Sequence, residues 1–165
     1  MPGFATTRLL IVFLLGLTIS GCGFRLAGDT SLPPELKQIY LVTHDFSNQQ
    51  RDALRRQLER AGAEVASQAD TPAVLLSVSL KIAPDRRLVT SASNGRIVER
   101  ITRSLNYSLK DADGKPLAAA ATLTREKDIV LDDDNLLSST VERRSVIEDI
   151  EQALYDGLIR QLKRI

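Results

Sequence analysis

The sequence has a single cysteine, few aromatic residues and no excess of either charge. Cys22 is the only cysteine, so no disulfide can form within the chain and an apolar core must stabilise the fold. Tryptophan is absent and aromatic residues make up 4% of the chain, which disfavours a carbohydrate-stacking site. The 22 basic side chains are matched by 21 acidic ones, so the net charge does not point to nucleic acid. A site for an anion would therefore have to be a local patch.

Long apolar runs are also missing, apart from one near the N-terminus. Residues 9–17 are apolar and follow Arg8. A helix over this run would span roughly 14 Å, which is about half of a bilayer core. The run is therefore too short for a transmembrane helix and is typical of a signal peptide.

The residues after this run, Ile19-Ser20-Gly21-Cys22, resemble the lipobox of bacterial lipoproteins. The resemblance implies that residues 1–21 are cleaved off as a lipoprotein signal peptide and that Cys22 is acylated. Several acyl chains anchor a protein stably, whereas one chain binds a membrane only marginally. Gly23, in place of aspartate, implies sorting to the outer membrane. The alternative is an ordinary secretory signal, but an exported lone thiol would then be free to form unwanted pairs.

The rest of the chain reads as a tether followed by one domain. Residues 22–36 are expected to form a lipidated tether, because Pro33 and Pro34 disfavour helix. Residues 37–165 are expected to form a single domain. Its predicted elements are a buried strand at 39–42, a helix from Ser47, strands at 74–82, 96–110 and 117–131, and a long C-terminal helix. This β-α-β-β-β-α order predicts an α+β fold in which two helices pack on one face of a four-stranded mixed sheet.

Local signals mark the ends of the two helices. Ser47 and Gln50 have the spacing of a capping box, and Gly62 lies where the first helix should end. Ser139 and Glu142 have the same capping-box spacing in the second helix. The sequence therefore predicts that the second helix begins near Ser139.

The spacing of apolar residues predicts which side chains face the core. On the strands these are Val74, Leu76, Val78, Leu80, Ile82, Ile97, Ile101, Leu105, Tyr107, Leu109, Ala119, Ala121, Leu123 and Ile129. On the last helix they are Ile147, Ile150, Leu154, Leu158 and Leu162. Ser93-Asn94-Gly95 and Asp113-Gly114 are hairpin turn signals, so the long strands are expected to pair with their neighbours in sequence.

The sequence offers no catalytic or metal-binding constellation. His44 is the only histidine, and no nucleophile motif accompanies it. Asp132, Asp133 and Asp134 are adjacent, whereas a calcium loop needs alternating oxygen ligands and a later bidentate carboxylate. We therefore predict that the protein is not an enzyme and binds no metal or other cofactor.

Several short motifs resemble the LptE family of lipopolysaccharide-transport lipoproteins. The mature start would read Cys22-Gly23-Phe24-Arg25-Leu26, and Leu32-Pro33-Pro34-Glu35-Leu36-Lys37 leads into an apolar strand. The segment Arg55-Arg56-Gln57-Leu58, the Asn94-Gly95 turn and the terminal Leu158-Ile159-Arg160-Gln161-Leu162 fit the same family in order. The resemblance extends across the mature chain, and it implies two helices packed against a four-stranded sheet.

The resemblance also implies a function without catalysis. A member of this family sits as a plug inside the β-barrel of LptD, assists assembly of that barrel and binds lipopolysaccharide on its way to the outer leaflet. It is anchored in the outer membrane by acyl chains, on the periplasmic side and within the barrel lumen. A neutral surface with mixed charges suits the wide polar lumen of a large barrel. The alternative is a free-standing lipoprotein facing the periplasm that carries or chaperones another envelope ligand.

Lipopolysaccharide carries phosphates and acidic sugars, and arginine forks are their natural ligands. The candidate ligands are Arg86, Arg87, Arg96, Arg100, Arg103, Arg143 and Arg144. The basic positions of the family correspond here to Ser93 and Ser139, so the resemblance implies only the regions, with Arg96 and Arg143 as neighbouring substitutes. The same arginines could instead form a solvated face or contact the barrel.

Overall fold

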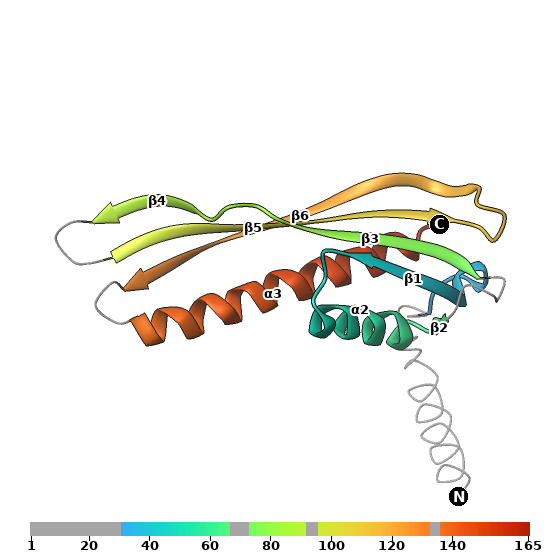
Figure 1. The fold of residues 1–165 in the computed structure, drawn as a ribbon, viewed down its shortest axis with the longest axis horizontal. Coiled ribbons are helices and arrows are strands. Elements are labelled where there is room, and N and C mark those ends of the chain that lie inside the picture. The colour runs from blue at the N-terminus through green and yellow to red at the C-terminus, as the bar shows by residue number, and fades with distance from the viewer. Residues whose placement is uncertain (1–30, 67–72, 92–95, 133–135) are drawn as a thin grey trace, which may run out of the picture.

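The computed structural model describes residues 31–66, 73–91, 96–132 and 136–165 of the chain (Figure 1). The described elements are η1 (Pro34–Leu36), β1 (Gln38–His44), α2 (Asn48–Arg60), β2 (Glu64–Ala66), β3 (Val74–Ile82), β4 (Arg86–Ser91), β5 (Arg96–Lys110), β6 (Pro116–Asp132) and α3 (Leu136–Leu162). The predicted signal peptide, Cys22, the Asn94-Gly95 turn and most of the acidic run at 132–134 lie outside the described residues. Among the described helices, none combines the length and the apolar character that crossing a membrane requires.

The predicted α+β class is correct, but the described part of the chain forms a sheet of six strands instead of four. Its order is β2-β1-β3-β5-β4, and β6 pairs with the other edge of β5. β1 is parallel to both β2 and β3, while β5 is antiparallel to β3, β4 and β6. The mixed sheet is therefore built around the long strand β5, and both helices lie on one of its faces (Figure 1).

The two strands that sequence reasoning missed are β2 and β4. β2 has three residues, which is too short for an alternating pattern to be recognised. β4 continues the line of β3 along the same edge of β5, but the chain is interrupted at residues 83–85. Pro84 lies in this interruption, and proline has no N–H to donate to a strand ladder. The interruption also brings Asp85 within reach of Arg103 and Arg143.

The core-facing side chains of β5 are those predicted. Ile97, Ile101, Leu105, Tyr107 and Leu109 are all buried. On β3, Ile82 is 62% exposed, because the strand ends there. On β6, Ala119 is exposed instead of facing inward with Ala121 and Leu123, which pack against the core. A bulge between Tyr107 and Leu109 shifts the register, and a shift by one residue moves a side chain to the other face of the sheet.

The predicted start of α2 is confirmed. Ser47 Oγ accepts a hydrogen bond from the Gln50 backbone N–H, and the Gln50 side chain accepts one from the Ser47 N–H. Gly62 follows the helix with a φ of +91°, a conformation that glycine adopts at no steric cost. Leu54 and Leu58 are fully buried, so this helix is fixed both by its cap and by its packing.

The predicted start of α3 is wrong, because the helix begins at Leu136, three residues before Ser139. Serine and threonine cost only a few tenths of a kcal/mol inside a helix. A capping-box spacing therefore does not by itself fix where a helix begins. The predicted stripe is buried at Ile150, Leu154, Leu158 and Leu162, and Ile147 packs against its edge.

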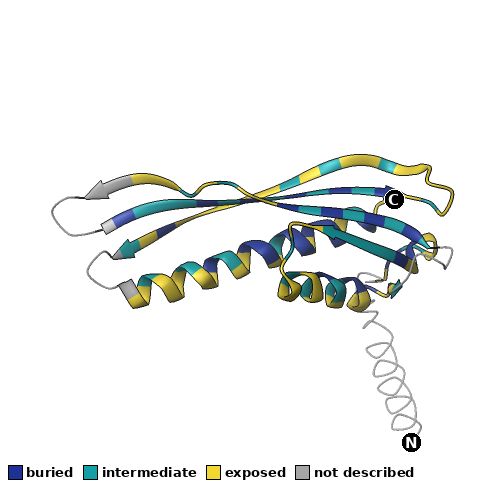
Figure 2. Cartoon of the chain, viewed as in Figure 1, coloured by how far each residue is buried: buried dark blue, intermediate teal, exposed yellow. Residues whose placement is uncertain are grey.

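The molecule is long, and its two ends are built differently. In α3, buried residues concentrate in the C-terminal half, beside α2 (Figure 2). We call the other end the distal half: β4, residues 96–103 of β5, 125–132 of β6 and 136–148 of α3. α2 does not reach the distal half, where three strands are covered by the first turns of α3 alone (Figure 1).

Candidate functional site

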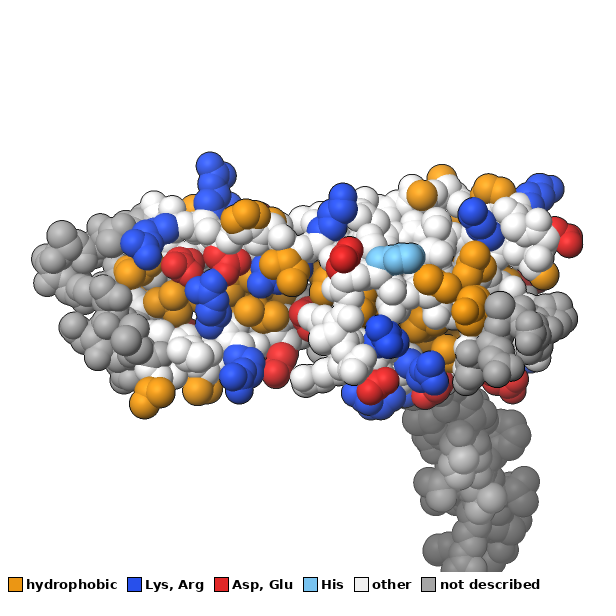
Figure 3. All heavy atoms as spheres, viewed as in Figure 1, with side chains coloured by type: hydrophobic (Ala, Val, Ile, Leu, Met, Phe, Trp, Pro, Cys, Tyr) orange, Lys and Arg blue, Asp and Glu red, His pale blue; other side chains and the backbone are white. Residues whose placement is uncertain are grey.

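All seven candidate arginines lie in the distal half. Arg86 and Arg87 lie on β4, Arg143 and Arg144 lie on α3, and the other three lie on β5. The family resemblance implied two separate binding regions, one near Ser93 and one near Ser139, and the fold brings the arginines near both into the distal half. Basic and acidic side chains are interspersed on the surface seen in Figure 3, so the distal half is a mixed-charge surface.

Arg103 lies on the inner face of β5, between Ile101 and Leu105. It is 5% exposed. Its Nη1 donates to the Thr102 carbonyl at 2.9 Å and lies 3.4 Å from Asp85 Oδ1. Burial lowers the pKa of Arg103, while the negative charge of Glu151 acts in the opposite direction. Arginine nevertheless stays charged in proteins, so Asp85 compensates a buried cation.

Arg143 connects α3 to the same acidic residues. It donates to Glu99 Oε2 at 2.7 Å and also to Asp85. Arg87 lies 4.0 Å from the other oxygen of Glu99. We call Asp85, Arg87, Glu99, Arg103 and Arg143 the ion-pair cluster. It joins the β3–β4 interruption, β5 and α3, and it holds the first half of α3 against the distal sheet.

Arg100 lies on the outer face of the distal half and is also paired. Its guanidinium binds both carboxylate oxygens of Asp128, at 2.7 and 2.9 Å, and lies 3.6 Å from Glu126. The bond to Asp128 raises the pKa of Arg100 and lowers that of Asp128. Both side chains are exposed to solvent, so we expect this pair to contribute little stability.

Arg86 and Arg144 remain available to a ligand. Arg86 is exposed and lies directly across the sheet from Arg100. Arg144 is exposed on α3. Neither forms an ion pair with any residue that the structure describes. The backbone of Arg96 pairs with Ser91 and Asp132 at the end of β5, and its side chain is outside the description.

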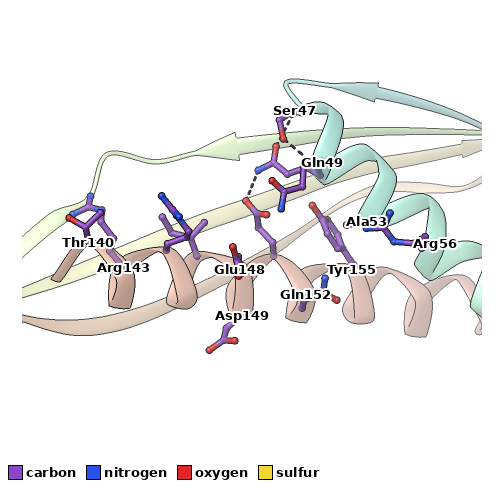
Figure 4. Close-up of a pocket in the computed structure, with 14 residues that line it drawn as sticks. Ser47, Gln49, Ala53, Arg56, Thr140, Arg143, Glu148, Asp149, Gln152 and Tyr155 are labelled. Carbon is purple, nitrogen blue, oxygen red and sulfur yellow. Dashed lines mark hydrogen bonds between the residues drawn. The ribbon is translucent and has the colours of Figure 1, made fainter. Parts of the chain in front are cut away.

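A groove that sequence reasoning missed lies between the start of α2 and the middle of α3 (Figure 4). Across it, the Gln50 side-chain amide donates to Glu151 Oε1 at 2.6 Å. Glu151 is 9% exposed, and burial raises its pKa. These two residues are 101 positions apart, so no local pattern could have paired them. In the sequence, the one signal for this groove was that Glu151, a charged residue, stands next to the apolar stripe of α3.

No arrangement for catalysis or metal binding is found among the described residues. No group of three or more histidine, cysteine, aspartate or glutamate side chains is placed to hold a metal there. His44 is exposed at the end of β1 and hydrogen-bonds no described hydroxyl group, whereas a serine nucleophile needs such a base.

Comparison with known proteins identifies the family. The model of the LptE family, described as lipopolysaccharide-assembly, matches residues 36–162. The LPS-assembly lipoprotein LptE of Photorhabdus laumondii subsp. laumondii is 26% identical over 161 residues, covering 93% of this chain and 85% of that protein. The LPS-assembly lipoprotein LptE of Yersinia enterocolitica is 34% identical over 71 residues, covering 39% of this chain and 34% of that protein.

Solved structures share the fold at low sequence identity. The solution structure of an uncharacterised lipoprotein B from Nitrosomonas europaea matches with a TM-score of 0.69 at 20% identity, covering 86% of this chain and 90% of that one. The rare lipoprotein B from Shewanella oneidensis matches with a TM-score of 0.59 at 13% identity, covering 76% and 92%. Because the family model spans residues 36–162, the chain belongs to the LptE family of lipopolysaccharide-assembly lipoproteins.

Proposed function

We propose that this protein is an outer-membrane lipoprotein that plugs an LptD-like β-barrel, helps that barrel to assemble, and binds lipopolysaccharide in transit to the outer leaflet. It acts as a structural and binding subunit and catalyses no reaction. Its membership of the LptE family carries the proposal. The curated relatives that it matches are named LPS-assembly lipoproteins, which supports a role in lipopolysaccharide assembly.

The shape of the domain supports a plug that lies along a barrel axis. The Leu32 N–H donates to the Ala61 carbonyl at 2.8 Å, which fixes the start of the domain at the end of α2. Lys110 lies at the same end, since it pairs with Leu75 and Leu75 pairs with Tyr40 of β1. From there β5 runs 15 residues to the distal half, a length of about 50 Å. That length exceeds the apolar band of a barrel, which is about 25 Å tall.

The first described residues of the chain lie at the opposite end of the domain from the candidate arginines (Figure 1). Cys22 lies about ten residues before Leu32 in the sequence, and an extended chain of about ten residues spans roughly 35 Å at most. An acylated Cys22 would therefore hold the end that carries β2 near the periplasmic leaflet. The distal half would then project along the barrel, away from the anchor, where it could meet lipopolysaccharide.

The uncovered face of the sheet also suits a polar barrel wall. Many outward side chains in the middle of β3, β5 and β6 are small and polar: Ser77, Ser79, Ser104, Asn106, Ser108, Thr122 and Thr124. Several of them bond one another across strands, such as Ser104 with Thr124 at 2.9 Å. Such a stretch of small polar side chains can lie close to a hydrated wall without burying charge.

Purification from the outer membrane tests the proposal. A tagged chain should bring down a β-barrel of several hundred residues in mild detergent. In the Cys22→Ala variant, the fraction of the protein that is not bound to the barrel should leave the membrane. The same Cys22→Ala variant, produced in cells depleted of the barrel, should become fully soluble in the periplasm, because neither acyl chains nor a barrel then hold it. Recovery of the unaltered chain only as a monomer would reject the plug and favour a free-standing carrier.

Charge reversal at the two unpaired arginines tests lipopolysaccharide binding. The double variant Arg86→Glu, Arg144→Glu should bind purified lipopolysaccharide about tenfold or more weakly, because each hydrogen bond to a charged group contributes about 1.5 kcal/mol or more. Fluorescence titration at fixed ionic strength measures this, since screening weakens exposed charges. Arg60→Glu, at the opposite end of the domain on α2, is the control and should keep its affinity. Equal affinities in all three proteins would exclude these two arginines.

A further inference from the structure

The groove between α2 and α3 has the dimensions of a binding site. Its volume is about 700 Å³, within the range of roughly 300 to 1,000 Å³ that is typical of ligand sites. Its polar lining includes Gln49, Gln50, Arg56, Glu151, Gln152 and Tyr155. In Figure 4, Gln49 projects from α2 and Tyr155 from α3, on the sides of the two helices that face each other. No residue of this groove belongs to the fold's strands.

Tyr155 gives the groove a hydrogen-bond donor that nothing in the described chain uses. The residue is 1% exposed, and its phenolic oxygen has no hydrogen-bond partner among the described groups. Its ring stacks with Phe46, at a centroid distance of 6.4 Å, and in Figure 4 it points from α3 towards α2. Burial and the nearby Glu151 raise the pKa of Tyr155, so the hydroxyl stays protonated. A buried hydroxyl normally has a partner, and a ligand in the groove could supply the missing acceptor.

The neighbouring polar groups show what kind of ligand would fit. Gln50 already donates to Glu151, and Gln152 Oε1 accepts from Gln57 at 2.8 Å. Gln49 and Arg56 are exposed at the rim and bond no described residue. The groove therefore offers unpaired hydrogen-bond donors, Tyr155 on its floor and Gln49 and Arg56 at its rim, and acidic residues lie close to them. A peptide group, which carries one acceptor and one donor, matches such a surface.

Charge and polarity disfavour lipopolysaccharide as the occupant. Glu148, Asp149 and Glu151 line the groove and oppose its arginines, one of which, Arg143, is already bound in the ion-pair cluster. A phosphate would need a basic excess here. An acyl chain would leave the three carboxylates and the unpaired polar groups of the lining without partners.

We propose that this groove binds an extended polypeptide segment of the barrel partner, with the Tyr155 hydroxyl donating a hydrogen bond to a backbone carbonyl of that segment. The inference rests on the proposed function, because the barrel encloses the flanks of a plug and so supplies the polypeptide nearest to the groove. It adds a defined contact site on the helical side, remote from the outer face of the sheet.

Photo-crosslinking in intact cells tests the groove. A photo-crosslinking amino acid at position 49 should capture one continuous segment of the barrel, identified by mass spectrometry. The same amino acid at position 60, in the last turn of α2, should not capture that segment, because Arg60 lies outside the groove. Capture of lipopolysaccharide instead of protein, or of scattered barrel sites, would overturn the proposal.

Tyr155→Phe tests the hydrogen bond itself, because it removes the hydroxyl and keeps the ring. We expect crosslinking from position 49 to fall about three- to tenfold, as for the loss of one hydrogen bond. The melting temperature of the isolated protein should stay the same or rise, since the hydroxyl has no partner within the described chain. Tyr107→Phe, on β5 outside the groove, is the matched control and should leave crosslinking unchanged.

The outcomes separate this inference from the proposed function. If the barrel co-purifies with the unaltered chain but position 49 captures none of it, the groove proposal fails and the plug stands. If Tyr155→Phe leaves the capture unchanged, the proposed hydrogen bond is wrong. If the unaltered chain brings down no barrel at all, the proposed function itself fails.

Discussion

Replacing Asp85 with alanine should lower the free energy of unfolding by about 3 kcal/mol, because it removes the counter-charge of a buried arginine. The side chain of Asp85 is 17% exposed and that of Arg103 is 6% exposed. Asp85 also binds Arg143, so one substitution leaves two cations of the ion-pair cluster without this partner. Urea denaturation followed by circular dichroism measures the change.

Two further variants show whether the loss comes from the buried charge. Asp149→Ala breaks a pair with Lys127 in which both side chains are at least half exposed, and it should cost less than about 1 kcal/mol. Adding Arg103→Met to Asp85→Ala removes the uncompensated cation and should restore most of the stability. Equal losses at Asp85 and Asp149, or no recovery in the double variant, would show that the ion-pair cluster does not hold the distal half.

The apolar pattern of the sequence was sufficient to place most of the core. On β5 the alternation predicts every buried apolar residue from Ile97 to Leu109, because a two-residue period fixes which face each side chain takes. The same alternation also places Glu99 and Arg103 on the inner face. That signal was present in the sequence, and the structure shows Arg103 buried among the residues of the core.

The contacts that sequence reasoning could not supply depend on local breaks in regularity. Asp85 reaches Arg143, 58 positions away, because β3 and β4 are separated at Pro84. Ala119 faces outward because of a bulge, which the alternation of apolar residues does not reveal. The groove arises where α2 lies beside α3, and side chains 101 positions apart meet there. Long-range geometry of this kind follows from the packing of whole elements.

The candidate arginines divide in a way that only the structure reveals. All carry the same charge, and the family resemblance singles out only Arg96 and Arg143. In the structure, Arg100, Arg103 and Arg143 have carboxylate partners within hydrogen-bonding distance. A paired guanidinium must give up its partner before it binds a new anion, so its net gain is small. Arg86 and Arg144 have no such cost, and we therefore expect them to contribute most to binding lipopolysaccharide.

Replacing Leu154 with alanine should cost about 3 kcal/mol, within the range of about 2 to 5 kcal/mol for buried leucines. Leu154 is fully buried on the half of α3 that packs against the core. Alanine is a better helix former than leucine, so any loss reflects packing and not helix propensity. Val141→Ala, on the exposed half of the same helix where Val141 is 69% exposed, should change stability by less than about 0.5 kcal/mol.

Amide hydrogen exchange would then distinguish the two attachments of α3, which are the apolar core around Leu154 and the ion-pair cluster in the distal half. Leu154→Ala should speed exchange throughout the domain, because a loss of about 3 kcal/mol is a large part of a typical stability of about 5 to 15 kcal/mol. Asp85→Ala should speed exchange mainly in the distal half, where the ion-pair cluster joins α3 to β5. If both variants speed exchange uniformly, α3 behaves as one unit, and the distal half has no independent attachment that a ligand or a barrel could alter.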